Sequence, residues 1–155
     1  MISIRKYEET DWKEVKKLAV YDDQVKYVGT IKDLFGNRLD SWNFQLIEAN
    51  EEIVGFFNID TGYASQYEFA YENEIGLRAF FISSEHQGNG YCTGTMKKLP
   101  EYLKENYQEY PSICLTVNSK NRAAYQCYLE GGFQDTGDLY YGGSAGPQHI
   151  MRMAY

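Results

Sequence analysis

Residues 75–93 read IGLRAFFISSEHQGNGYCT, and this stretch decides the fold of the chain. Its first eight residues, Ile75–Ile82, form the most apolar run of the sequence and predict a central, buried strand. A glycine-rich turn follows at 87–90, and apolar residues at helical spacing come after it. A strand, a glycine turn and a helix in this order predict an anion site, because successive backbone N–H groups and the positive end of the helix dipole meet at the turn.

The chain around this stretch alternates short strands and helices, which predicts one α/β (α+β) domain over residues 1–155. No linker, internal repeat or low-complexity segment divides it. Strands are expected at 2–5, 42–49, 53–60, 112–117, 133–141 and 148–155. Helices are expected at 11–19, within 21–40, at 121–129, and after the glycine turn, where Met96, Leu99 and Leu103 share a face.

The composition is that of an ordinary globular protein, with 43% hydrophobic and 24% charged residues. The net charge of −7 argues against nucleic-acid binding, which needs a basic surface. No apolar run approaches the ~20 residues that span a bilayer, and the N-terminal segment lacks the apolar core of a signal peptide. We therefore expect a cytoplasmic protein that binds neither nucleic acid nor membranes.

The three cysteines and two histidines show no spacing typical of metal ligands, so no metal site is expected. Cys114 lies in an apolar, strand-like run and is expected to be a small buried residue.

Acidic residues are concentrated in the first half of the chain, where residues 1–83 hold 15 acids against 9 bases. This excess either keeps the protein soluble or shapes a pocket for a cationic substrate. The segment 60–74 contains no Lys or Arg, and it is either a solvated connection or a cation-binding lip. Its acids are Asp60, Glu68, Glu72 and Glu74, and its tyrosines are Tyr63, Tyr67 and Tyr71.

The glycine turn resembles the acetyl-CoA loop of the GNAT superfamily, written Q/R-x-x-G-x-G/A after a hydrophobic strand. Gln87, Gly90 and Cys92 occupy the named positions, with Cys92 in place of the family's Gly or Ala. The turn does not match the Walker pattern, which needs Gly-Lys-Ser/Thr, nor the dinucleotide fingerprint, which needs Gly or Ala at Thr93.

A second segment resembles the family's N-x-x-A-x-x-x-Y-x-x-x-G-F helix, and it follows the first in the expected order. Its matching residues are Asn121, Ala124, Tyr128, Gly132 and Phe133. The resemblance implies the GNAT fold, a mixed, mostly antiparallel sheet flanked by helices. Its central parallel strands, here 75–82 and 112–117, should splay apart to admit the cofactor.

The resemblance implies direct transfer of the acetyl group of acetyl-CoA, as cosubstrate, to a primary amine of a small-molecule acceptor. A protein or peptide N-acetyltransferase and a non-catalytic CoA-binding regulatory module are the alternatives, and a homodimer is compatible with the sequence. The run 80–82 most resembles the polyamine acetyltransferases. Those enzymes carry acidic residues where this chain has Arg78-Ala79. Arg78 would repel a dication and could pair with an anion on the substrate. Segment 60–74 instead favours a cation, so the sequence leaves the identity of the acceptor open.

The resemblance also implies roles for particular residues. Tyr128 aligns with the general acid that protonates the coenzyme A sulfur, and Tyr27 and Arg78 are expected to contact the acceptor. Glu74 shares the parity of Arg78 and Phe80 along its strand, so it is a candidate base acting through water, against the alternative of a surface carboxylate. The residues expected to bind the cofactor are Phe80, Phe81, Ile82, Gln87, Gly88, Asn89, Gly90, Tyr91, Cys92, Thr93 and Asn121.

Overall fold

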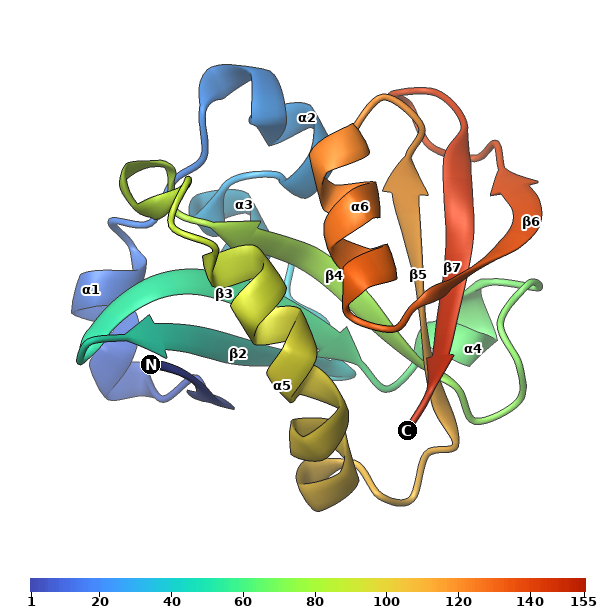
Figure 1. Ribbon diagram of the computed structural model, residues 1–155, viewed down its shortest axis with the longest axis horizontal. Coiled ribbons are helices and arrows are strands. Elements are labelled where there is room, and N and C mark those ends of the chain that lie inside the picture. Colours follow the sequence, from blue (N-terminus) through green and yellow to red (C-terminus); the bar gives the residue numbers. More distant parts are fainter.

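The computed structural model describes residues 1–155 and contains a seven-stranded sheet with the strand order β1-β2-β3-β4-β5-β7-β6 (Figure 1). Every neighbouring pair is antiparallel except β4 and β5, which are parallel. This confirms the mixed, mostly antiparallel sheet. The strands are β1 (Ile2–Lys6), β2 (Trp42–Ala49), β3 (Glu52–Asp60), β4 (Ile75–Ile82), β5 (Ser112–Asn118), β6 (Gln134–Tyr140) and β7 (Gln148–Ala154).

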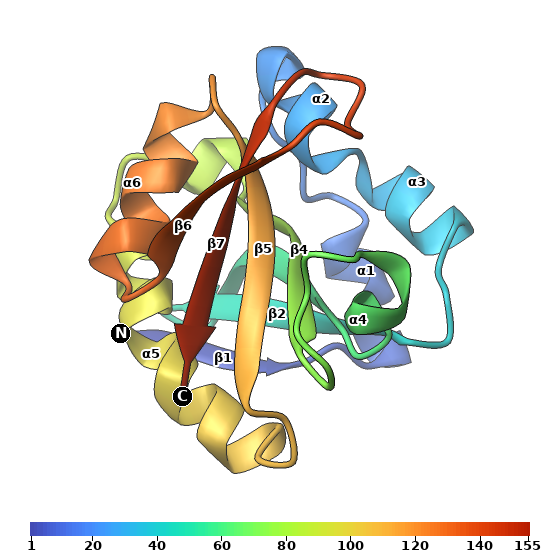
Figure 2. The ribbon, with the colours of Figure 1, turned by 90° about the vertical axis from the view of Figure 1, so that its right-hand side faces the viewer.

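Helices cover both faces of the sheet, with α5 and α6 on one side and α1 to α4 on the other (Figure 2). The helices are α1 (Trp12–Val15), α2 (Val25–Val28), α3 (Ile31–Gly36), α4 (Tyr63–Gln66), α5 (Tyr91–Asn106) and α6 (Arg122–Glu130), with 3-10 turns at Glu9–Asp11, Asp22–Gln24 and Ser84–His86. None of the helices is long and apolar enough to cross a membrane.

The helix expected at 11–19 is shorter than the pattern predicted. Glu8 and Asp11 form a reciprocal cap, so the chain enters the 3-10 turn at Glu9. Ala19 does not continue the helix, because its carbonyl accepts a hydrogen bond from the amide of Ser84 at 2.7 Å. This bond ties the end of the segment to the chain that follows β4.

The parallel strands β4 and β5 pair only at their beginnings. Ile75 lies opposite Ile113 and Gly76 opposite Cys114, and no further pairs follow. The two strands then diverge, as Figure 1 shows, and β5 pairs with β7 on its other side along its whole length. The splayed central pair is confirmed, and the opening lies at the carboxyl end of β4, next to the glycine turn.

A bulge in β4 changes the face on which its later side chains lie. The pairing of β3 with β4 shifts register between Phe56 and Asn58, and Ala79 has a φ of +53°. Phe80 consequently lies in the core beneath α5 and α6 together with Leu77, while Phe81 packs in the core on the opposite face. The parity argument that placed Phe80 with Arg78 is therefore wrong, because it assumed an unbroken strand.

The helix α5 buries the predicted face against the sheet. Met96, Leu99 and Leu103 are fully buried in the larger core, and the helix continues through Pro100. Each of these side chains contributes on the order of 1.5–3 kcal/mol through burial. This packing fixes the start of α5, and with it the glycine turn, against the end of β4.

Candidate active site

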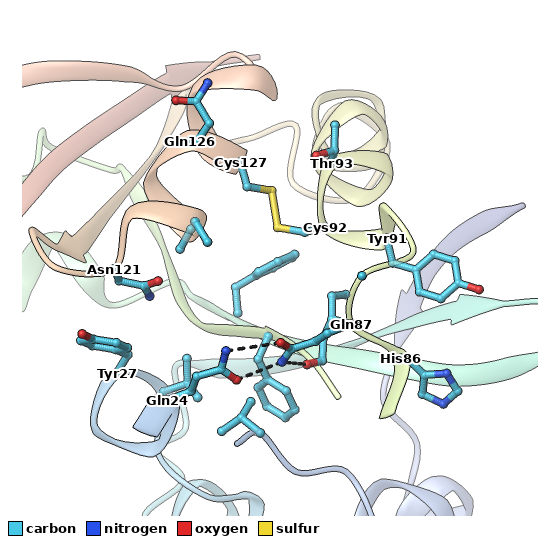
Figure 3. Close-up of a pocket in the computed structure, with 18 of the residues that line it drawn as sticks. Gln24, Tyr27, His86, Gln87, Tyr91, Cys92, Thr93, Asn121, Gln126 and Cys127 are labelled. Atoms are coloured by element: carbon cyan, nitrogen blue, oxygen red, sulfur yellow. Dashed lines mark hydrogen bonds between the residues drawn. A yellow bond between two sulfur atoms is a disulfide. The ribbon is translucent and has the colours of Figure 1, made fainter. Parts of the chain in front are cut away.

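A first cavity of ≈ 440 Å³ lies between the end of β4, the glycine turn and α6 (Figure 3). Ten of the eleven residues predicted to bind the cofactor line it; Asn89 does not, because its side chain donates to the carbonyl of His86 at 2.9 Å. Tyr27, predicted to contact the acceptor, lines this cavity as well. The sequence argument did not assign the other residues that α6, α2 and the segment before α2 contribute, which include Val20, Gln24, Val28, Ala123, Ala124, Gln126, Cys127 and Glu130.

The glycine turn has the backbone geometry of an anion site. Gly88 and Gly90 have φ values of +86° and +77°, which side-chain-bearing residues rarely adopt. Gly90 is the N-cap of α5, and no acidic residue lies in the first turn of this helix. The first turn of α5 therefore offers amides without intrahelical partners beside the cavity, and no carboxylate of that turn competes for them. The one acid on the cavity wall, Glu130, accepts a hydrogen bond from Thr93 at 3.2 Å.

Gln87 holds the turn in place and connects it to the segment before α2. Its Nε2 donates to the carbonyl of Ile82 at 2.9 Å and to Oε1 of Gln24 at 3.0 Å, and Gln24 donates back at 3.3 Å (Figure 3). Because the side-chain amides of Gln24 and Gln87 hydrogen-bond to each other, α2 and its Tyr27 are fixed relative to the glycine turn. Gln24 carried no signal in the sequence, since the bond joins residues far apart in the chain.

A disulfide joins Cys92, in the first turn of α5, to Cys127 of α6, with 6.4 Å between the Cα atoms. Both cysteines line the first cavity. The sequence has three cysteines, and these two are 35 positions apart, so no local pattern indicated this pair. Cys114 is free and buried, as predicted, and burial raises the pKa of its thiol to about 12.

Removal of the disulfide is expected to lower thermal stability strongly. Closing a loop of this length restricts the unfolded chain by about 3–4 kcal/mol, which corresponds to a fall in Tm of about 10 °C for a domain of this size. The measurement is a melting curve of the wild type with and without a dithiol reductant. The variant Cys92→Ser/Cys127→Ser serves as the control, because its lower Tm should not respond to the reductant. An unchanged Tm on reduction would contradict the prediction.

A second cavity of ≈ 340 Å³ lies on the other side of Phe80. It shares Tyr27, Val28, Phe80 and Asn121 with the first cavity, so the two meet where β4 and β5 separate. Asn121 stands at the N-cap of α6, but its side chain makes no capping hydrogen bond. The side-chain amide of Asn121 is therefore free to contact a ligand in either cavity.

Tyr128 lines the second cavity from α6. The side chain is 7% exposed, and its ring packs edge-on against Phe80 and Phe133 at 6.1 and 5.7 Å. Burial raises the pKa of the Tyr128 hydroxyl above its usual value. The hydroxyl therefore stays protonated at neutral pH beside the second cavity, next to Phe80, which both cavities share.

Glu74 lies away from both cavities, at the end of β4 that is paired with β5. The carboxylate is fully buried and accepts from Arg152 Nε at 2.6 Å, Arg152 Nη2 at 3.0 Å, Ser112 Oγ at 2.6 Å and the Tyr71 amide at 3.0 Å. Glu74 is therefore neither a base that faces the cleft nor a surface carboxylate. The structure instead makes Glu74 the buried partner of Arg152, which the sequence could not indicate because 78 residues separate them.

Glu74→Gln is expected to destabilise the fold and leave catalysis intact. The side chain of Gln has one acceptor oxygen where Glu has two. Some of the N–H and O–H groups that now donate to Glu74 would therefore face the new NH₂ group. Breaking a buried ion pair costs about 3–5 kcal/mol, or a fall in Tm of about 10 °C, while kcat should change less than twofold. Melting curves and steady-state rates check both statements, with the exposed Glu72→Gln as the control. A large loss of kcat at an unchanged Tm would restore Glu74 as a candidate base.

Arg78 lines the second cavity, where the guanidinium is held by neighbouring side chains. Its Nε donates to the buried Asp60 at 2.8 Å, and its two other nitrogens donate to Tyr67 and Gln66 at 3.2 and 2.9 Å. The guanidinium also lies 5.0 Å from the ring centre of Tyr63. Segment 60–74 thus binds cations of the protein itself: Arg78 here, and Arg152, which lies 3.6 Å from the ring centre of Tyr71.

Comparison with known proteins agrees with this fold. The chain is similar to the uncharacterized N-acetyltransferase YbbJ of Bacillus subtilis (strain 168), with 25% identity over 142 residues, 88% of this chain and 87% of the relative. It also resembles the crystal structure of aminoglycoside acetyltransferase AAC(6')-Ib in complex with coenzyme A, with a TM-score of 0.80 and 19% identity over 99% of this chain and 95% of the other.

A further similar structure is spermidine N-acetyltransferase from Vibrio cholerae in complex with CoA and spermine, with a TM-score of 0.72 and 18% identity over 99% of this chain and 95% of the other. At these identities the two solved structures show a shared fold. The family model described as acetyltransferase (GNAT) family matches residues 2–133. That match spans most of the chain and includes both the glycine turn and the helix of Tyr128. The chain therefore belongs to the acetyltransferase (GNAT) family.

Proposed function

We propose that this enzyme transfers the acetyl group of acetyl-CoA to a primary amine of a small-molecule acceptor by direct attack on the thioester. The observation that carries the proposal is the pair of cavities that meet at Phe80. One cavity ends at the amides of a helix N-terminus, and the other contains a buried, protonated Tyr128. An extended cosubstrate and a small acceptor would thus meet at a point where a proton donor is available.

The first cavity fits an extended, anionic cosubstrate. Its pyrophosphate would accept hydrogen bonds from the amides of residues 88–93, because the glycines bring the backbone close to the ligand. The pantetheine arm would run along residues 80–82, where β4 has left β5 and its main chain faces the opening. In this pose a backbone N–H next to the Ala79 bulge could polarise the thioester carbonyl and stabilise the oxyanion that develops.

Two proton transfers complete the reaction. Attack by the neutral amine forms the C–N bond and breaks the C–S bond, and the departing thiolate takes a proton from the Tyr128 hydroxyl. The phenolate then regains its proton from solvent. No carboxylate or imidazole lines the second cavity, so the amine would lose its own proton to water. Tyr128 would act as the general acid, and no side chain would act as the base.

A small acceptor is favoured over a peptide by the walls of the second cavity. Tyr27 of α2 and residues 142–145 of the β6–β7 connection both line it, and its volume is ≈ 340 Å³. A peptide substrate would need an extended groove that is open at both ends, whereas a cavity of this volume suits a small molecule.

The test is a thiol-release assay with acetyl-CoA and a panel of amino acids, polyamines, aminoglycosides and short peptides. Thiol release should depend on a primary amine, and mass spectrometry should detect the N-acetylated small molecule. Binding of acetyl-CoA without amine-dependent release would instead indicate a regulatory module, and acetylation of peptides alone would indicate a peptide acetyltransferase.

A further inference from the structure

The ionised side chains that line the second cavity are both cationic, although the protein as a whole is acidic. Lys26 and Arg78 are the only ionised side chains among its 20 lining residues, and no Asp or Glu is among them. The remaining polar groups are neutral phenols, amides and hydroxyls. A pocket for a dication such as a diamine would need carboxylates at its wall, because burying an unpaired ammonium is costly.

Two buried acids that flank β4 are already paired with arginines of the protein. Asp60 is fully buried beneath Arg78 and accepts hydrogen bonds from its Nε and from the amide of Gly62. Glu74 is paired with Arg152. Neither carboxylate lines the cavity, so neither can receive the distal ammonium group of a polyamine.

The guanidinium of Arg78 is held rigidly and retains free donors. Its three hydrogen bonds, to Asp60, Tyr67 and Gln66, use three of its five N–H groups. The side chain is 23% exposed and its partner Asp60 is 0% exposed, so the cation and not the anion borders the cavity. A planar guanidinium with two N–H groups that make no hydrogen bond within the protein matches the geometry of a carboxylate or a phosphate group.

The two cations lie on walls that adjoin the reaction point. Arg78 precedes Phe80 by two residues on β4, and Lys26 precedes Tyr27 on α2; both Phe80 and Tyr27 lie where the cavities meet. We propose that the acceptor is a small amine that also carries a carboxylate, an amino-acid-type substrate whose carboxylate is bound by Arg78 and Lys26. This inference rests on the proposed acetyl transfer. The cavity volume of ≈ 340 Å³ is at the small end of the range for ligand sites, about 300–1,000 Å³.

Matched acceptors test the proposal directly. Each amino acid is compared with its carboxamide, and lysine and ornithine are also compared with the diamines that lack the carboxylate. The best amino acid should have a kcat/KM at least about tenfold above that of its amide or diamine, the equivalent of one charged hydrogen bond. Equal or better activity with the amide, with spermidine or with kanamycin would overturn the proposal while leaving acetyl transfer intact. Absence of transfer to every amine would instead defeat the proposed function.

Variants show whether the two cations are responsible. Lys26→Glu reverses the charge of an exposed side chain, so it should raise KM for the amino acid at least about tenfold and leave KM for its amide nearly unchanged. Lys32→Gln, on the exposed side of α3 and outside both cavities, is the charge control. Equal effects of Lys26→Glu on the acid and on its amide would overturn the role of Lys26.

The Arg78 variant must not leave Asp60 as an unpaired buried charge. Asp60→Asn/Arg78→Gln removes both charges together and keeps the acceptor oxygen for Gly62. A melting curve confirms that this variant is folded. Its selectivity for the acid over the amide should fall at least about tenfold while kcat with the amide is retained. Unchanged selectivity in the folded variant would overturn the assignment of Arg78.

Discussion

Gly90→Val is expected to abolish measurable acetyl-CoA binding. A Cβ at this position would meet no protein atom within 4 Å, so it would project into the space in front of the turn. A β-branched residue also does not tolerate the φ of +77°. The turn would rearrange and withdraw its amides from the pyrophosphate. Loss of two charged hydrogen bonds, at about 1.5–3 kcal/mol each, corresponds to an affinity at least about a hundredfold lower.

Gly137→Val is the matched control for backbone strain. Gly137 has a φ of +86° and also has no neighbour within 4 Å, but it lies in β6 and lines neither the first nor the second cavity. Isothermal titration calorimetry with acetyl-CoA, alongside melting curves, should show a normal Kd for the control. An unchanged Kd in Gly90→Val would remove the glycine turn as the phosphate site.

Tyr128→Phe is expected to lower kcat and leave the fold and the affinity for acetyl-CoA unchanged. The ring packs against Phe80 and Phe133, and Phe preserves these contacts. The hydroxyl is the only group lost, and general acid catalysis is worth ~10²–10⁴-fold. A loss of at least about tenfold in kcat is therefore the minimum expected. Steady-state kinetics with one acceptor, together with a melting curve, checks it.

Tyr128→Ala separates packing from proton donation. If the ring only packs against the pantetheine arm, Tyr128→Phe keeps a near-normal kcat while Tyr128→Ala raises KM for acetyl-CoA. That outcome would eliminate the general-acid role and leave water as the proton source. If Tyr128 is the acid, both variants should lose kcat.

The sequence by itself determined the buried strand at 75–82, the glycine turn and the helix of Tyr128. These features are local: an apolar run makes a buried strand, and glycines permit the positive φ values of the turn at Gly88 and Gly90. The spacing from Asn121 to Tyr128 indicated the helix α6 for the same reason. Residues close in the chain fix each of these features, so one sequence is enough to predict them.

Only the tertiary structure decided how the site is completed. The bulge at Ala79 turned Phe80 toward the α5 and α6 core, whereas strict alternation placed it with Arg78. Glu74 proved to be the buried partner of Arg152, and Arg78 is held by Asp60 from the neighbouring strand.

The disulfide between Cys92 and Cys127 and the amide pair of Gln24 and Gln87 likewise join distant parts of the chain. The physical reason is common to all of these features. The role of a charged or polar side chain depends on the partner that folding brings to it, and partners separated by 18 to 78 residues leave no local pattern in the sequence.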